Sequence, residues 1–151
     1  MTMRLNGRKI LAQAAGLAIV AAGLTLGTAS VASAAGTCSG SLVGTYHLKQ
    51  TDGTIVSTAR VYYSSANGGT NCVTNTAVLY YGKLTQLNVW VGRHDGTGVV
   101  GDLDDYRYYA GPVSVTRTDG KCIDFGVGAA DGPNATMKYI WQRVWTNVHC
   151  G

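Results

Sequence analysis

The chain has 151 residues, of which 46% are hydrophobic and only 13% charged, a composition that argues against intrinsic disorder and fits one folded domain. Its formal net charge of +4 comes from 12 basic and 8 acidic residues, but three of the basic residues lie within the first nine positions. Removal of the N-terminal segment would leave nine basic against eight acidic residues, or +1, so the charge gives no support to a nucleic-acid-binding protein.

The first 34 residues have the pattern of a cleavable signal peptide. A basic stretch, Met1–Lys9, precedes the apolar run Ile10–Leu26, and Ala32-Ser33-Ala34 supplies an A-x-A cleavage signal. The alternative is an uncleaved membrane anchor, because the apolar run is about long enough to span a bilayer. The small residues that follow this run favour cleavage after Ala34 or Ala35. We therefore expect an exported domain over residues 35–151 that is not held in a membrane.

The remainder of the chain reads as short strands separated by glycine-rich turns. Residues 55–63 and 87–91 alternate apolar and polar side chains with the period of a half-buried strand. Further extended segments separated by turn residues occur along the chain: a turn at 67–69, an extended run over 72–79, a strand at 113–116, a hairpin signal at 119–120 and an extended run from 122 to 125. The pattern predicts an all-β fold, a small antiparallel sandwich or barrel.

The C-terminal stretch 139–148 is ambiguous. Trp141, Val144, Trp145 and Val148 have the i, i+3, i+4, i+7 spacing of a helix face. The β-prone composition of the same stretch favours a strand, which is our prediction.

The four cysteines, Cys38, Cys72, Cys122 and Cys150, all follow the predicted cleavage site. No C-x-x-C pair is present and the three histidines lack ligand spacing, so zinc is disfavoured. An even set in an exported chain predicts two disulfides and no free thiol. Three connectivities are open, and the spacing does not choose among them. The nested pairing, Cys38 with Cys150 and Cys72 with Cys122, would tie the two chain ends together and is the one we favour.

Reactive groups are sparse. The chain has no nucleophile-elbow, zinc-protease or phosphate-loop motif. The acidic run Asp102–Asp105 supplies oxygen ligands for calcium, but it lacks the other features of a calcium loop and fits a solvated turn better. His94-Asp95 with His149 is the best candidate for an acid–base group, although adjacent polar loop residues more often have no catalytic role. We therefore predict no catalytic residue, no metal and no cofactor.

Aromatic residues are the more informative population. Trp90 lies on the polar side of its predicted strand, and Tyr106, Tyr108 and Tyr109 occur almost in series. Exposed rings of this kind stack on sugars or form adhesive contacts. Against this, one ring of each tyrosine pair is expected to fill the core while the other covers the sheet. These four residues are the candidate ligand-binding or surface aromatics.

Several segments resemble the spore-associated protein A family of small exported actinobacterial proteins. The similar segments include all four cysteines: Cys38-Ser39-Gly40-Ser41, Gly69-Thr70-Asn71-Cys72-Val73, Tyr106-Arg107-Tyr108-Tyr109-Ala110-Gly111-Pro112-Val113, Gly120-Lys121-Cys122-Ile123 and His149-Cys150-Gly151. The resemblance implies an extracytoplasmic protein found with spores or aerial hyphae, and it brings no catalytic residue with it.

The sequence thus favours a secreted, non-enzymatic, surface-associated protein whose partner is a spore surface or a cell-wall polymer. Two alternatives stay open: an extracellular carbohydrate- or cell-wall-binding module, and a secreted inhibitor or small hydrolase.

Overall fold

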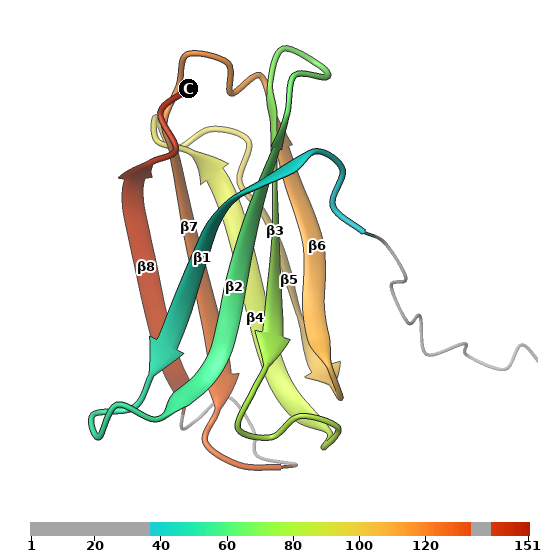
Figure 1. Cartoon of the computed structure of the whole chain (residues 1–151), viewed down its shortest axis with the longest axis vertical. Helices are drawn as coiled ribbons and strands as arrows, with labels where there is room; N and C mark the ends of the chain where they lie inside the picture. Colours follow the sequence, from blue (N-terminus) through green and yellow to red (C-terminus); the bar gives the residue numbers. More distant parts are fainter. Residues whose placement is uncertain (1–36, 134–139) are drawn as a thin grey trace, which may run out of the picture. The chain divides into compact units, whose positions relative to one another are not determined.

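Two four-stranded antiparallel sheets pack face to face in the computed structural model, which describes residues 37–133 and 140–151 (Figure 1). One sheet has the strand order β1-β2-β3-β6 and the other the order β5-β4-β7-β8. The strands are β1 (Ser41–Lys49), β2 (Ile55–Ser64), β3 (Thr70–Ala77), β4 (Thr85–Arg93), β5 (Val100–Tyr106), β6 (Tyr109–Thr116), β7 (Ile123–Ala130) and β8 (Ile140–Val148). The predicted all-β sandwich is confirmed. No helix able to cross a membrane occurs in the described residues. The predicted signal peptide, 1–34, and both cleavage positions lie outside them.

The core lies between the two sheets and follows the period of two in the sequence. Along β4, buried Leu87, Val89 and Val91 alternate with half-buried side chains on the other face. The first sheet contributes Val61 and Val73, which are fully buried opposite them. Each sheet therefore buries one face in the core, which is the arrangement that period-two strands predict.

The predicted turns are present, but the turn at 119–120 connects strands of different sheets where two paired strands were expected. Between β2 and β3, Gly69 has a φ of +84°, and a Cβ placed there would lie 2.3 Å from the backbone nitrogen of Asp119, so only glycine fits. The turn at 119–120 was expected to close a hairpin. Instead it carries the chain across the sandwich, because β6 pairs with β3 whereas β7 pairs with β4 and β8.

The C-terminal stretch is a strand, as predicted, and β8 pairs with β7 at the edge of the second sheet. Trp141 and Trp145 pack against the core, whereas Val144 between them is 52% exposed. Val144 thus belongs to the outer face, so the apparent helical spacing arose by chance from residues on both faces of a strand.

All four cysteines form disulfides, and the predicted nested pairing is wrong. The bonds are Cys38–Cys72 and Cys122–Cys150, with Cα–Cα distances of 5.6 and 3.9 Å. Cys72 alternates with the core residue Val73 and therefore lies on the outer face of the first sheet, while Cys122 immediately precedes β7 in the second sheet. Packed sheets lie about 10 Å apart, too far for these two residues to be bridged.

Candidate functional site

Trp90 lies on the outer face of the second sheet. Its neighbours along β4, Val89 and Val91, point into the core, so the strand alternation turns the indole outward, where it is half-buried. The ring rests on Gly126 of β7, since a Cβ placed on Gly126 would lie 2.3 Å from the indole Nε1. On the other side, Trp90 pairs across the sheet with Gly101 of β5. Glycine on both flanks gives the indole room to lie over the sheet.

The surroundings of Trp90 combine apolar and amide side chains. Asn88, two residues earlier on the same face, lies over Gly128 and pairs across the sheet with Leu103, which is 54% exposed. Exposed Val144 of β8 pairs with Gly126 on the far side of the ring. We call Trp90, Asn88, Leu103 and Val144 the Trp90 face. A half-buried aromatic ring on an outer sheet face, bordered by amide and aliphatic groups, is chemically suited to stacking on a sugar ring.

Tyr106 has a structural role and does not belong to this face. It is half-buried against the core, and its hydroxyl donates to Asp102 Oδ1 at 2.6 Å. Asp102 Oδ2 in turn accepts the backbone N–H of Gly111 at 2.6 Å. Burial, followed by the hydrogen bond to the Asp102 carboxylate, raises the pKa of Tyr106. The phenol therefore stays protonated and bonded to Asp102, and it is the Asp102 carboxylate that ties β5 to β6.

The acidic run lies in strand β5 and not in the solvated turn that we expected. Both carboxylate oxygens of Asp102 accept hydrogen bonds, from Tyr106 and Gly111, whereas Asp104 and Asp105 are exposed. Within residues 37–133 and 140–151, no three His, Cys or acidic side chains gather as metal ligands.

Tyr108 belongs to a separate aromatic patch at one end of the sandwich. It lies in the β5–β6 turn, is 48% exposed and packs against Tyr81 of the β3–β4 loop, with ring centroids 5.1 Å apart. Tyr81 is the more exposed of the two, at 62%. Val78, Leu79 and Leu84 of the same loop are also exposed beside it in sequence. Tyr81 was not among the candidate residues, and it lies in a turn, outside the alternation of the strands.

Tyr109 begins β6 in the first sheet, pairs with Thr76 and is half-buried. The four candidate aromatics therefore lie in distinct environments: Trp90 on the second sheet's outer face, Tyr106 at the core, Tyr108 at the end patch and Tyr109 on the first sheet. They do not form one binding site.

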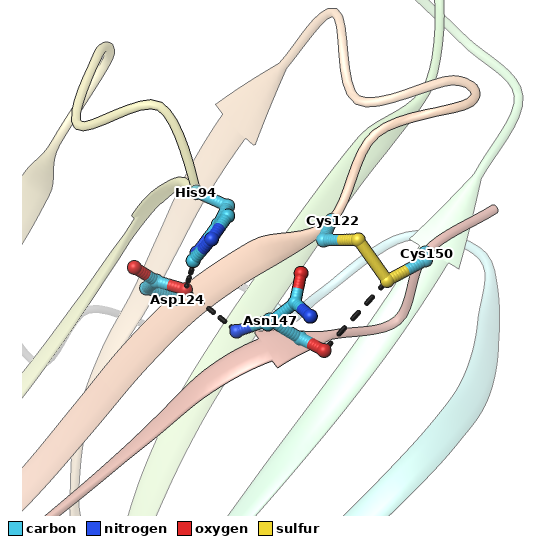
Figure 2. The surroundings of a disulfide bond; sticks show 5 residues. All are labelled: His94, Cys122, Asp124, Asn147 and Cys150. Atoms are coloured by element: carbon cyan, nitrogen blue, oxygen red, sulfur yellow. Dashed lines mark hydrogen bonds and ion pairs between the residues drawn. A yellow bond between two sulfur atoms is a disulfide. The ribbon is translucent and has the colours of Figure 1, made fainter.

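The acid–base candidates also have partners other than those expected (Figure 2). His94 donates from Nδ1 to Asp124 Oδ1 at 2.8 Å, and the backbone N–H of Asn147 donates to the same oxygen at 2.8 Å. Burial alone would raise the pKa of Asp124, but the hydrogen bonds from Asn147 and His94 outweigh it and lower the pKa. Asp95, the expected partner of His94, instead accepts the backbone N–H and the hydroxyl of Thr97.

His149 lies in an aromatic cluster, where its Nε2 shares a hydrogen bond of 2.9 Å with the Tyr46 hydroxyl. Tyr46 in turn packs edge-on against Phe125 and beside Trp145, at 5.0 and 5.1 Å between ring centroids. Burial lowers the pKa of His149 and raises that of Tyr46, so both groups are held neutral.

The described contacts thus give His94 a carboxylate partner but no nucleophile. In the part of the chain that the structure describes, no Ser or Thr hydroxyl is hydrogen-bonded to the imidazole, and every cysteine is in a disulfide. A His–Asp pair orients an imidazole for proton transfer, but acyl-transfer chemistry also needs the attacking group.

Comparison of the chain with protein-family models, with curated proteins and with solved structures gave no match.

Proposed function

We propose that the protein is exported and acts without catalysis at the cell surface, as a component of the spore coat or of aerial hyphae. The observation that carries this proposal is the disulfide arrangement. Cys38–Cys72 fixes the segment before β1 to β3, and Cys122–Cys150 fixes the last residues to the start of β7. Both ends of the described domain are thereby cross-linked, as suits a protein that persists outside the cell.

A non-enzymatic role accords with the chemistry of the described surface. The His94–Asp124 pair lacks a nucleophile, and Asp102 is occupied by contacts within the fold. The side chains that can contact a partner are instead aromatic and aliphatic, and they belong to the Trp90 face and to the Tyr81–Tyr108 pair. The location at spores or hyphae rests on the family resemblance of the sequence.

A second candidate function, binding of a carbohydrate or cell-wall polymer, is favoured by one specific observation. Trp90 is held against Gly126 on an outer sheet face, so the indole is positioned before any ligand arrives. A ring that is already fixed loses little entropy when it stacks on a sugar.

Fractionation of the producing culture tests the first proposal. The proposal predicts that the protein, lacking residues 1–34 or 1–35, is enriched in wall and spore-coat fractions. Recovery mainly from the cytosol with the leader intact would contradict it.

Retention on insoluble peptidoglycan, chitin and cellulose tests the second function. We expect Trp90→Ala to lower retention about ten-fold, because stacking of one aromatic ring contributes on the order of 1–2 kcal/mol. Tyr81→Ala is the matched control, since it removes an exposed ring outside the Trp90 face. Equal retention of wild type and Trp90→Ala would eliminate the Trp90 face as the binding surface.

A further inference from the structure

The outer face of the first sheet is rich in hydroxyl groups. Its residues alternate with the buried Ala59, Val61 and Val73, so their side chains point away from the core. The registers place them side by side across β1, β2 and β3, the strands seen in front in Figure 1. The central members of this face, which we call the Arg60 face, are Thr45, Arg60, Tyr62, Thr74 and Thr76.

Charge is distributed unequally between the two sheets. The strands β1, β2, β3 and β6 contain two basic residues, Lys49 and Arg60, and no acidic residue. The strands of the second sheet contain four of the eight aspartates, three of them in β5, against two arginines, Arg93 and Arg143. The Arg60 face therefore attracts anions, whereas the edge of the second sheet repels them.

Arg60 lies at the centre of this face with most of its hydrogen-bonding capacity unused. Its Nη1 donates to the Thr76 hydroxyl at 3.4 Å, one contact for a group with five N–H donors. None of the ion pairs in the described residues includes Arg60 or Lys49. Across the sheet Arg60 pairs with Thr45 on one side and Thr74 on the other. The guanidinium is thus flanked by hydroxyls on both neighbouring strands and by no carboxylate.

This set of groups suits a tetrahedral oxyanion such as phosphate. The planar guanidinium binds phosphate oxygens in pairs, and surrounding hydroxyls can donate to the remaining oxygens. Tyr62 lies two residues along β2 on the same face, is half-buried and adds an aromatic side chain to it. A ring next to an anion site suits a polymer in which phosphates alternate with sugars or polyols.

We propose that the Arg60 face binds a phosphate-bearing glycopolymer of the cell wall, with a phosphate at Arg60 and the adjoining sugar or polyol toward Tyr62. This inference rests on the proposed surface location and names the class of polymer involved. It uses the opposite sheet from the Trp90 face, so the two surfaces can be tested separately.

The test measures binding of the purified, disulfide-bonded protein to soluble poly(glycerol phosphate) and to wall sacculi before and after acid extraction of phosphate polymers. We expect wild type to bind the polymer and the unextracted sacculi, and to lose binding on extraction and at high salt. Arg60→Gln should weaken binding about ten-fold, and Arg60→Lys, which keeps the charge but loses the planar fork, should weaken it less. Lys121→Gln removes an exposed charge outside the face and should bind as wild type does.

Thermal unfolding of each variant checks that a loss of binding is not a loss of folding, and Arg60→Lys keeps the test valid if Arg60→Gln unfolds. Equal affinity of wild type and Arg60→Gln for poly(glycerol phosphate) would overturn the inference, as would binding to polygalacturonate alone. It would also be overturned if Arg60 mediated only association between copies, seen as dimers that Arg60→Gln abolishes without polymer present. Retention on sacculi that survives both extraction and Arg60→Gln would reject this inference and leave the surface location standing. No retention on any sacculi would count against both.

Discussion

Asn75 joins the two sheets through the core, and its replacement is the most direct test of how the sandwich is held together. The side chain is fully buried on β3, and its Nδ2 donates to the backbone oxygens of Asn88 on β4, at 2.9 Å, and Gly128 on β7, at 3.0 Å. Its cross-strand neighbours are Ala59 and Ala110, small residues that leave space for the amide. One buried group therefore bonds to two strands of the opposite sheet.

We expect Asn75→Ala to lower the free energy of unfolding by about 2–4 kcal/mol. Two buried hydrogen bonds contribute about 1 kcal/mol each, and truncation also leaves a small cavity and two carbonyls with fewer partners. For a domain of this size the loss corresponds to a fall in melting temperature of roughly 10 °C or more. Urea and thermal unfolding of the non-reduced protein, followed by circular dichroism, measure both quantities.

Two further variants separate hydrogen bonding from packing. Asn75→Asp keeps the shape but removes the amide donors that face the two carbonyls, so it should destabilise at least as much as Asn75→Ala. Asn88→Ala is the matched control, because its side chain lies on the outer face and its loss should change stability by less than about 1 kcal/mol. If Asn75→Ala stays within about 0.5 kcal/mol of wild type, the amide does not contribute as the geometry implies.

The disulfide pairing, the position of the Trp90 ring and the protonation of His149 can each be tested. Non-reducing peptide mapping should recover Cys38 linked to Cys72 and Cys122 linked to Cys150, and a peptide joining Cys38 to Cys150 would disprove this pairing. Replacing both cysteines of either disulfide by alanine should lower the free energy of unfolding by about 3.5 kcal/mol. Gly126→Ala places a methyl group against the Trp90 indole, so it should shift the tryptophan fluorescence and lower the free energy of unfolding by about 1–3 kcal/mol. An unchanged emission spectrum would show that the indole does not rest on Gly126. The pKa of His149 in the folded protein lies below its ordinary value of 6.5, so the imidazole binds a proton more readily in the unfolded chain than in the folded protein. The neutral His149 side chain therefore contributes fully to stability above pH 6.5, and this contribution is lost as the pH falls through the lowered pKa. His149→Gln should remove this part of the pH dependence in unfolding curves measured from pH 8 to pH 5, and an unaltered curve would assign it to another group.

The sequence by itself determined the fold class, the position of several strands and the outward direction of Trp90. These features depend on local periodicity, because neighbouring side chains in a strand point to opposite faces whatever the strand pairs with. Residues 87–91 illustrate this, since their alternation alone separates core valines from Trp90. The cysteine count likewise predicted two disulfides and no free thiol.

Tertiary structure decided which residues meet. Cys72 lies in the first sheet and Cys122 immediately precedes β7 of the second, which excluded the nested pairing. The chain crosses between the sheets at 119–120, where a hairpin was expected. In the same way His94 is paired with Asp124, 30 positions away, and not with its neighbour Asp95. Such contacts depend on strand order and on the separation of the sheets, neither of which leaves a periodic trace in the sequence.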